Sequence, residues 1–579
     1  MKNVIIIGGM AAGCKTAARL SRLCPDYQIT LIEKSPFISF SSCGLPLYAS
    51  GEINDLSELN KTPYGAVRDK KYFSQVKGVK VLTETEVNEI NADKKELTCR
   101  SIQNGDVFKL NYDCLVIATG SETIKPGFPF PASPLVSSFH SPADVKYFRQ
   151  SAQKGEIEKA VIIGGGFIGC EMLEALSSLW GIETVLIESK ASLLSSVLDS
   201  EISGYVENEI PAGKIQLMLS TTVKKIEINS IGAPVVYLDN GKEIITDFVF
   251  YCLGVKPDAG LAKASGAACG MYGGILVDEQ MRTSLPDVWA AGDCVEIKNL
   301  VTGRYDYFSF GSLSNRMGRV AADSIAGLSY GGNNISFNGS AGSISLKLFD
   351  NIICAAGLTE ARAGRLGYET GSVIGCWYDR PDYYPEAKNI FGKLVYEKRT
   401  LKLLGLQLSG EGEVTRYADV FSELLSQNKN VEDLMNLEHG YTPAHSSPLS
   451  PLNYLGYMAV NQETDGVKNC SPAMLSSFNG SLIDVREPVE VEAATVDLPA
   501  LSSGVRIIQV PLSQLRLRLN ELDLNKPAMC VCERGTRAYE AARLLMNKGF
   551  KNVSYLGGGL LLCNKINKFS GFMEKSYER

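Results

Sequence analysis

One cysteine of this chain lies in a sequence context that favours redox chemistry. Cys43 belongs to the segment 39–46, Ser-Phe-Ser-Ser-Cys-Gly-Leu-Pro, and no second cysteine lies two or five residues away. A single thiol exchanges with a disulfide, a persulfide or a peroxide, but it cannot form the internal Cys–Cys pair of a dithiol reductase. Cys43 is therefore predicted to react directly with its substrate.

Two glycine-rich turns occur within the same arrangement of elements: a strand, the turn, a helix, and a second strand that ends in an acid. The strand, turn and second strand are residues 4–7, 8–13 and 28–33 in the first unit, and 160–163, 164–169 and 183–188 in the second. The glycines let the backbone approach a pyrophosphate at the positive end of the helix, and the acid accepts a hydrogen bond from a ribose hydroxyl. Two such units predict two dinucleotide-binding domains.

The length of 579 residues is too great for a single core. Strand-and-turn patterns at 113–120 and 289–293 indicate that the first nucleotide domain is interrupted by the second. After residue 332 the pattern changes to short strands. A polar stretch that is typical of a linker follows, and after it an α/β pattern restarts. We expect an FAD-binding domain at 1–119 and 251–332, an NAD(P)H-binding domain at 120–250, a dimerisation domain at 333–458, a linker at 459–476 and a rhodanese-like domain at 477–579.

Composition excludes several classes of function. The formal net charge of −6 argues against nucleic acid or a membrane surface as the main partner. No apolar run approaches the roughly 18 residues of a membrane span, and the apolar N-terminus is predicted to be a short strand that ends at Gly8. Fifteen cysteines without an export signal indicate reduced thiols and a cytoplasmic location.

Residues 1 to about 455 resemble the single-cysteine branch of the flavin-dependent pyridine nucleotide-disulfide oxidoreductases, which includes coenzyme A-disulfide reductases, NADH oxidases and NADH peroxidases. Residues from about 475 onward resemble a rhodanese domain, and the whole chain is similar to fused coenzyme A-disulfide reductase–rhodanese proteins. The resemblance implies an α/β fold with two Rossmann-like dinucleotide-binding domains, an α+β dimerisation domain and a C-terminal rhodanese-like α/β domain. It also implies a homodimer.

The resemblance implies FAD and NADH (or NADPH) as cofactors, coenzyme A as a substrate or bound carrier, and no metal. Glu188 favours NADH because an acid at this position repels a 2′-phosphate, although Lys190 follows closely. The implied cofactor-binding residues are Gly8, Ala11, Gly13, Glu33, Lys34, Thr119, Gly120, Gly164, Gly166, Phe167, Ile168, Gly169, Glu188, Gly254, Gly292 and Asp293.

The Cys43 motif combines features of two branches of the family. Leu45-Pro46 is similar to the coenzyme A-disulfide reductases, whereas Ser42 is similar to the oxidases and peroxidases. Those enzymes carry a histidine in the first glycine turn, and Ala11 stands at that position here. The missing histidine argues against peroxidase chemistry.

Further site residues follow from the resemblance. Tyr383, Tyr384 and Tyr441 match tyrosines that the reductases bring to the thiol, and the first pair comes from the partner subunit. A phenol there can donate a hydrogen bond to a leaving thiolate. The implied coenzyme A-binding residues are Arg19, Arg22, Ser39, Ser42 and Lys71, of which the two arginines lie on one helix face and equally fit a solvated surface.

The rhodanese resemblance rests on the loop 532–537, Cys-Glu-Arg-Gly-Thr-Arg, which precedes a helical pattern at 538–547. In rhodaneses such a loop surrounds the cysteine with backbone N–H groups, and the helix adds its positive end, so that a bound persulfide anion is stabilised. Cys532 is thus implied as a second catalytic thiol. Cys530 lies outside the register of the loop and is predicted to be a core residue.

These features predict an enzyme that passes electrons from NADH or NADPH through FAD to Cys43 and reduces coenzyme A disulfide, coenzyme A persulfide or polysulfide, while Cys532 handles sulfane sulfur. Its partners would be these small molecules and a second copy of the chain. One alternative is an NADH oxidase with a Cys43 sulfenic acid, which Ser42 favours. The other is a redox sensor or sulfur-carrier module with little turnover.

Overall fold

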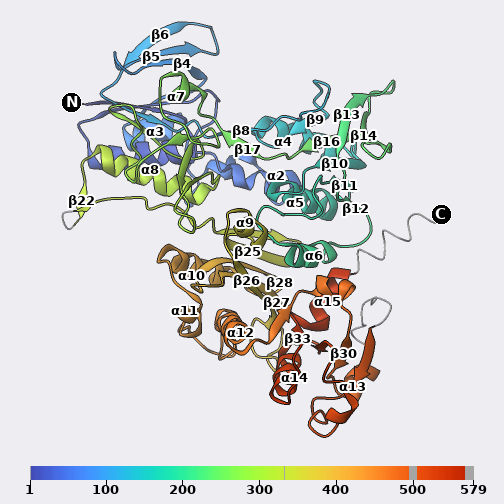
Figure 1. Ribbon diagram of the computed structural model, residues 1–579. Coiled ribbons are helices and arrows are strands. Elements are labelled where there is room, and N and C mark those ends of the chain that lie inside the picture. The colour runs from blue at the N-terminus through green and yellow to red at the C-terminus, as the bar shows by residue number, and fades with distance from the viewer. Residues whose placement is uncertain (1, 331–332, 494–504, 568–579) are drawn as a thin grey trace. The chain divides into compact units, whose positions relative to one another are not determined.

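A computed structural model of the protein describes residues 2–330, 333–493 and 505–567 (Figure 1). The chain forms two compact units, one of residues 1–189 and 214–340 and one of residues 190–213 and 341–579. The last residues of the predicted rhodanese-like domain lie outside the described ranges. Within those ranges, no helix is both long and apolar enough to cross a membrane.

The first sheet of the N-terminal unit is parallel. Its strands, in spatial order, are β19 (Val288–Ala290), β7 (Cys114–Ile117), β1 (Asn3–Ile7), β2 (Gln28–Ile32) and β3 (Lys80–Leu82). The central strands are buried, apolar and rich in Val, Ile and Leu, as expected for a parallel sheet with both faces covered. The helices α1 (Ala11–Leu23) and α8 (Gly311–Ile325) lie against each other beside this sheet (Figure 1).

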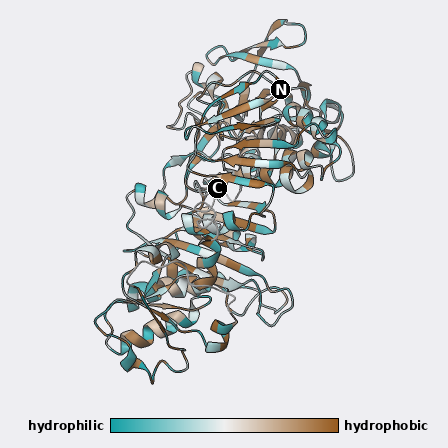
Figure 2. Ribbon diagram, turned by 90° about the vertical axis from the view of Figure 1, so that its right-hand side faces the viewer, coloured by the Kyte–Doolittle hydropathy of each residue, from teal (hydrophilic) through white to brown (hydrophobic). Residues whose placement is uncertain are grey.

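The second sheet of this unit repeats the arrangement of the first. Its strands, in spatial order, are β12 (Ile215–Met218), β11 (Glu183–Ile187), β10 (Lys159–Ile163), β16 (Phe248–Tyr251) and β9 (Val136–Ser138), all in parallel pairs. The helix α4 (Pro142–Gln153) precedes β10, and α5 (Phe167–Glu174) continues into a π-helical turn, η3 (Ala175–Leu179). Strands of the sheets are predominantly hydrophobic in Figure 2.

The duplication extends beyond the glycine turns. A three-stranded antiparallel sheet precedes β7 in the first domain, and another precedes β16 in the second. The first comprises β4 (Thr85–Asn91), β5 (Glu96–Ser101) and β6 (Val107–Asn111), and the second β13 (Val223–Ile228), β14 (Pro234–Leu238) and β15 (Glu243–Ile245). Two Rossmann-like domains thus carry the same insertion, and the first resumes after the second because β19 belongs to the first sheet.

Cys43 lies between β2 and β3, in a short segment with clear boundaries. A 3₁₀ turn, η1 (Ser42–Gly44), leads directly into the helix α2 (Leu45–Ser50). Pro46 occupies the first turn of α2, where its missing N–H costs nothing. Gly51 ends the helix in the left-handed conformation at φ +95°. Cys43 therefore lies in a turn immediately before a short helix whose two ends are well defined.

The C-terminal unit contains an antiparallel sheet, which corresponds to the predicted dimerisation domain. Its strands, in spatial order, are β24 (Ile344–Leu348), β25 (Asn351–Gly357), β28 (Leu403–Gly410), β27 (Asn389–Glu397) and β26 (Thr370–Tyr378). The helices of this region are α9 (Glu360–Arg365), α10 (Thr415–Ser426), α11 (Val431–Met435) and α12 (Pro451–Asp465).

Residues 190–213 were expected in the second nucleotide domain, but they group with the C-terminal unit. The reason is a buried ionic cluster between the helix α6 (Ser200–Asn208) and the antiparallel sheet. Lys393, whose side chain is only 2% exposed, pairs with Glu201 at 3.0 Å and with Asp199 at 3.4 Å. Moving the segment away from the sheet would leave the buried charge of Lys393 without these partners. The cluster therefore holds residues 190–213 against the sheet.

The last sheet is parallel and belongs to the predicted rhodanese-like domain. Its strands, in spatial order, are β29 (Lys468–Cys470), β33 (Val553–Leu556), β32 (Ala528–Val531), β30 (Ser481–Asp484) and β31 (Arg506–Gln509). The segment 459–476, expected as a linker, instead contains the end of α12, the edge strand β29 and most of a 3₁₀ helix. The helices α14 (Thr536–Asn547) and α15 (Gly559–Asn567) complete the fold.

Candidate active sites

The first glycine turn joins β1 to α1 and leaves no room for side chains at two of its positions. Gly8 has φ +107°, and a Cβ atom there would lie 2.0 Å from the carbonyl oxygen of Ala118. A Cβ atom on Gly13 would lie 1.8 Å from the carbonyl oxygen of Gly8. The N–H of Gly9 donates to the buried carboxylate of Glu33 at 2.6 Å. These contacts fix the turn at the positive end of α1, which suits a pyrophosphate.

The second turn, between β10 and α5, repeats this geometry closely. Gly164 has φ +111°, and a Cβ atom there would lie 2.4 Å from the carbonyl oxygen of Cys252. A Cβ atom on Gly169 would lie 1.9 Å from the carbonyl oxygen of Gly164. The N–H of Gly165 donates to Glu188 at 2.6 Å. Both acids at the strand ends therefore bind their own glycine turn.

The two turns differ at their middle position. A Cβ atom on Gly166 would meet no other atom within 4 Å, so the backbone there is open to a closely approaching ligand. Met10 stands at the equivalent point and precedes α1 directly. Ala11 is the first residue of α1, whereas Phe167 and Ile168 begin α5. The second turn thus gives freer backbone access than the first.

Asp293 follows β19 at the same edge of the first sheet as the first glycine turn. Its two carboxylate oxygens accept hydrogen bonds from Ser309 at 2.5 Å and from Ser314 at 2.7 Å, and Gly292 beside it has φ +94°. The hydroxyl of Tyr307 is buried close to Asp293 and makes no well-formed hydrogen bond. An unpaired buried hydroxyl beside a fixed carboxylate fits a polar group of a ligand at this edge.

The remaining predicted cofactor residues lie around the crossing between the two nucleotide domains. The hydroxyl of Thr119 donates to the carbonyl oxygen of Asp258 at 2.5 Å, and Lys34 pairs with the Asp258 carboxylate at 3.6 Å. Gly120 and Gly254 have φ values of +78° and +94°. Both glycines occupy left-handed positions that other residues rarely adopt.

Cys43 is exposed to solvent, and its sulfur faces the first residue of α8, where a Cβ atom on Gly311 would lie 3.9 Å away. Partial desolvation raises the pKa of the Cys43 thiol, and the charges of Glu171 and Asp293 raise it further. Ser42, beside it, is also exposed. Cys43 is thus accessible, but its surroundings favour the neutral thiol over the thiolate.

Glu171 is a residue of this site that the sequence analysis missed. It lies on α5, two residues after Gly169, and burial raises its pKa to about 7, with a further contribution from Glu174. Its charge in turn raises the pKa of the Cys43 and Cys252 thiols. At neutral pH this carboxyl can therefore either hold or release a proton. The available signal was a charged residue among the apolar first turns of a helix.

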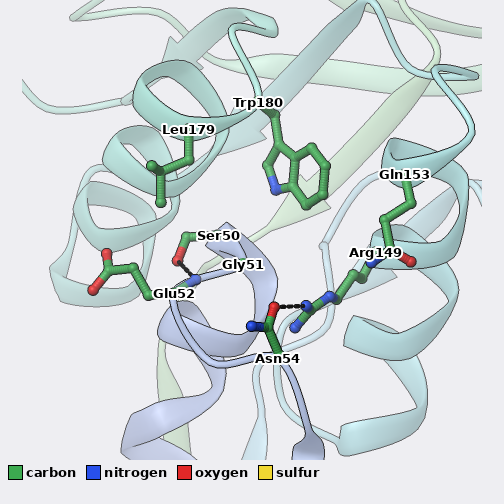
Figure 3. A pocket seen from close by; sticks show the side chains of 8 residues that line it. All are labelled: Ser50, Gly51, Glu52, Asn54, Arg149, Gln153, Leu179 and Trp180. Atoms are coloured by element: carbon green, nitrogen blue, oxygen red, sulfur yellow. Dashed lines mark hydrogen bonds between the residues drawn. The ribbon is translucent and has the colours of Figure 1, made fainter.

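The far end of α2 is fixed by side chains from the second nucleotide domain. Arg149 of α4 donates to the side chain of Asn54 at 3.2 Å, and the indole N–H of Trp180 donates to the carbonyl oxygen of Ala49 at 2.7 Å. Asn54, Arg149 and Trp180 line a pocket of about 290 Å³ (Figure 3). Because α2 begins two residues after Cys43, the contacts also restrain the thiol.

The cations predicted to bind coenzyme A have different surroundings. Arg19 pairs with the fully buried Asp323 of α8 at 2.7 Å. Arg22 and Lys71 are exposed. Ser39 has φ +54°, and its N–H donates to the carbonyl oxygen of Gly9 at 2.7 Å. Arg19 therefore serves the packing of α1 on α8, whereas Arg22 and Lys71 remain predicted phosphate ligands.

The structure brings the two predicted tyrosine motifs together. Tyr383 is 71% exposed and Tyr441 is 49% exposed. A hydrogen bond from Tyr383 to Tyr441 raises the pKa of the Tyr383 phenol. Tyr384 lies within the same loop, 5.7 Å from the guanidinium of Arg380. Two exposed phenols that share one hydrogen bond suit a surface that meets another protein or a ligand.

Cys532 lies in the loop between β32 and α14 and is buried. Its sulfur accepts hydrogen bonds from the backbone N–H groups of Gly535 at 3.2 Å and of Ala538 at 3.4 Å. On the other side of the loop, the N–H of Leu560 donates to the carbonyl oxygen of Cys532 at 2.9 Å. The loop and the positive end of α14 therefore converge on the sulfur, an arrangement that stabilises a thiolate or a persulfide anion.

Two arginines near Cys532 are paired with carboxylates. Arg486 forms a buried, bidentate pair with Asp484, the last residue of β30, with a shortest distance of 2.7 Å. Arg537 pairs with Glu490 through both of its terminal nitrogens, one of them at 2.6 Å. This pairing lowers the pKa of Glu490 to about 2. These pairs fix the positions of both arginines beside the loop.

Comparison with known proteins agrees with this architecture. The description "Pyridine nucleotide-disulphide oxidoreductase" matches residues 2–312, its dimerisation domain matches residues 345–449, and a rhodanese-like domain matches residues 472–562. The chain belongs to the pyridine nucleotide-disulphide oxidoreductase family. The expected fold class, with two Rossmann-like domains, an α+β dimerisation domain and a rhodanese-like domain, is confirmed.

Individual family members resemble this oxidoreductase along most of their length. The structure of a NAD-dependent persulfide reductase from A. fulgidus is 35% identical and superposes with a TM-score of 0.90, covering 97% of this chain and 99% of the other. A NAD(P)H coenzyme A polysulfide/persulfide reductase of Pyrococcus horikoshii is 31% identical over 78% of this chain and 97% of its own. An NADH oxidase of Methanocaldococcus jannaschii is 29% identical with the same coverage.

The residues of this oxidoreductase fit the two cofactors of the family, FAD and NAD(P)H. The first glycine turn, Glu33 and Asp293 would hold FAD, and the buried hydroxyl of Tyr307 lies near Asp293. The second turn would hold the nicotinamide nucleotide, with Gly166 open for its pyrophosphate. The glycines at close-approach positions and the acids bound to their turns are the features that such ligands require.

Proposed function

We propose that this oxidoreductase reduces coenzyme A disulfide, coenzyme A persulfide or polysulfide with NADH or NADPH, through the single thiol of Cys43. The observation that carries the sulfur part of this proposal is the second thiol site. The sulfur of Cys532 accepts two backbone N–H hydrogen bonds at the N-terminus of α14, which suits a bound persulfide. One chain that carries both a redox thiol and a sulfur-carrying thiol is suited to the reduction of sulfane sulfur.

The redox step needs two electrons and one proton at Cys43. When bound, FAD supplies the path for electrons from the nicotinamide nucleotide to the sulfur atoms at Cys43. The sulfur–sulfur bond between Cys43 and the substrate then breaks, and the substrate sulfur leaves with a proton as a thiol or as hydrogen sulfide. Cys43 remains as a thiolate that can attack the next disulfide or persulfide.

The side chains near Cys43 control where the proton goes. Burial raises the pKa of Glu171 to about 7, so this carboxyl can hold or release a proton at neutral pH near Cys43. Its loss of a proton would also place a second negative charge near Cys43, so the thiolate forms more readily while Glu171 is protonated. Tyr383 and Tyr441 share a hydrogen bond. We assign to them the role of hydrogen-bond donors to the leaving sulfur atom.

We propose that the tyrosines act across a homodimer. They lie in the region that matches the dimerisation domain, and Tyr383 is 71% exposed within its own chain. Supply of both phenols by the partner subunit would explain this exposure. We also place the enzyme in the cytoplasm, because a chain with fifteen cysteines suits a reducing compartment.

A second candidate is an NADH oxidase, in which Cys43 alternates between a thiolate and a sulfenic acid. The similarity to the M. jannaschii NADH oxidase and the presence of Ser42 favour it. Against it stands Ala11, because peroxide chemistry uses a proton donor at that turn and the three histidines, at 140, 439 and 445, lie elsewhere in the sequence.

The purified protein itself distinguishes the two candidates. Its intact mass before and after dithiothreitol, together with its visible spectrum, would show a releasable coenzyme A adduct and a flavin if the reductase proposal is correct. Steady-state NADH oxidation with coenzyme A disulfide or a persulfide should then exceed NADH-dependent oxygen uptake. A single extra oxygen on Cys43 with rapid oxygen uptake would instead support the oxidase.

A further inference from the structure

The arginine in the Cys532 loop contacts residues of the dimerisation domain. Arg534 is 21% exposed, and its side chain reaches the antiparallel sheet of the dimerisation domain. One terminal nitrogen donates to Asn389 Oδ1 at 2.7 Å and to Cys376 Sγ at 3.4 Å. The guanidinium also stacks on the ring of Tyr378, 3.9 Å from its centroid. A planar guanidinium with a stacking partner and a hydrogen-bond acceptor is strongly oriented.

The three contacts lie at one end of a single hairpin. Tyr378 is the last residue of β26, Asn389 is the first residue of β27, and the two pair directly in the strand register. The connection between them, residues 379–388, carries Tyr383. Cys376 is buried, and burial raises the pKa of its thiol to about 12, so Arg534 contacts a neutral sulfur. Arg534 thus holds the base of the tyrosine hairpin, defined here as β26, β27 and residues 379–388.

On the loop side, Arg534 controls a peptide that contacts the reactive sulfur. The N–H that donates to Cys532 at 3.2 Å belongs to Gly535, so it lies in the peptide unit that joins Arg534 to Gly535. Gly535 has φ +101°, a conformation that glycine leaves easily. The preceding part of the loop is anchored within its own domain, because the N–H of Leu561 donates to the carbonyl oxygen of Glu533 at 2.9 Å. After that point the carbonyl oxygen of Gly535 accepts from the N–H of Tyr539 at 2.9 Å, and the side chain of Arg534 restrains the peptide unit that lies between these two anchors.

We propose that Arg534 is a positioning residue that ties the Cys532 loop to the base of the tyrosine hairpin and thereby keeps the Gly535 N–H directed at the Cys532 sulfur. The reactivity of Cys532 then depends on the dimerisation domain as well as on the rhodanese-like domain. This inference rests on the proposed sulfur-handling role of Cys532. It assigns Arg534 no contact with substrate.

The test is the pH profile of Cys532 alkylation by iodoacetamide in the holoenzyme, followed by peptide mass spectrometry. In Arg534→Gln we expect the midpoint to move upward by about one pH unit, since a thiolate loses a backbone donor. Asn389→Ala and Tyr378→Leu leave the charge of the loop unchanged and should move it in the same direction. If only Arg534→Gln moves the midpoint, the positive charge of Arg534 affects Cys532 directly, and the proposal that Arg534 positions the loop is wrong. An unchanged profile in all three variants also overturns the proposal.

A matched control separates loop positioning from general docking of the domain. Arg543 lies on the same helix, α14, and its side chain contacts the carbonyl oxygen of Asp465 at 3.3 Å. Arg543→Gln should leave the profile where it is, and a shift equal to that of Arg534→Gln would contradict the proposal. If Arg534→Gln does not fold, Asn389→Ala and Tyr378→Leu decide the question.

The proposed function can fail independently of this inference. Turnover of Cys532→Ser with coenzyme A persulfide reports whether Cys532 handles sulfane sulfur, whereas alkylation reports only the state of the loop. Full turnover in Cys532→Ser would remove the proposed function of that thiol. A midpoint shift in the anchor variants would still establish Arg534 as a positioning residue.

Discussion

The two thiols of this oxidoreductase have opposite environments. Cys43 is exposed, and desolvation together with the charges of Glu171 and Asp293 favours its neutral form. Cys532 is buried, and two backbone N–H groups donate to its sulfur. The first environment raises the energy of a thiolate, which makes it a strong nucleophile once formed. The second stabilises an anion and suits a sulfur atom that is stored and passed on.

The largest effect that the comparison predicts follows from removal of the exposed thiol. Cys43→Ser should reduce turnover with both coenzyme A disulfide and a persulfide by about 10³-fold or more, because no other group forms the mixed disulfide. The visible spectrum should still show bound flavin. Assays of NADH oxidation with each acceptor check this result. Retention of either activity would show that Cys43 is not the shared redox thiol.

Removal of the buried thiol should affect one class of substrate only. Cys532→Ser is expected to lower turnover with sulfane-sulfur donors by about tenfold or more and to leave coenzyme A disulfide reduction unchanged. The two assays on the same preparation provide the internal control. An equal loss with both substrates would mean that the two thiols do not divide the chemistry.

The tyrosine pair should have a smaller effect. Tyr383→Phe removes the phenol that donates to Tyr441, and we expect kcat with coenzyme A disulfide to fall about tenfold, equivalent to about 1.4 kcal/mol. Tyr441→Phe should have a similar effect, and the double variant should be little worse than either because the two hydroxyls act as one unit. Fully additive losses would indicate independent roles. Tyr237→Phe, in the nucleotide domain, is a control with no expected change.

A further prediction concerns folding stability rather than turnover, at the carboxyl beside Cys43. The pKa of Glu171 rises from 4.5 to about 7 in the folded protein, so its stabilising proton is fully present below about pH 4.5 and lost as the pH rises through about 7. Above that pH the buried charge costs up to about 3 kcal/mol. Glu171→Gln should therefore raise Tm relative to the parent at pH 8 more than at pH 5.

The matched control for this measurement is Glu156→Gln, which changes an exposed carboxyl of the same domain. Its Tm difference from the parent should not depend on pH. A Glu171→Gln difference that is also constant between pH 5 and pH 8 would show that this carboxyl is ionised throughout and cannot exchange a proton with Cys43.

The features that sequence reasoning predicted are those that a short segment specifies by itself. A glycine that must adopt φ above +100° and pack against a carbonyl oxygen, as Gly8 and Gly164 do, leaves a clear trace in the sequence. The acids that bind these turns, Glu33 and Glu188, follow at nearly equal spacings of 24 and 23 residues from their donors. The Cys532 loop is equally local, since both N–H donors lie within six residues of the sulfur.

The features that sequence reasoning missed depend on contacts between distant segments. The segment 190–213 joins the C-terminal unit because Lys393 pairs with Asp199, 194 residues away, and neither residue shows this alone. The strand β29 has only three residues and no apolar alternation, so its sequence, Lys-Asn-Cys, gave no strand signal. The role of Arg534 could not be predicted, because its partners belong to another domain.

The contacts of Arg534 also limit how freely the parts of this protein can be exchanged. A transplanted rhodanese-like domain without an arginine at this loop position would leave Tyr378 and Asn389 without their partner. The unit that recombines as a functional whole is therefore larger than one domain. It comprises the C-terminal domain together with Tyr378, Asn389 and the strands that carry them.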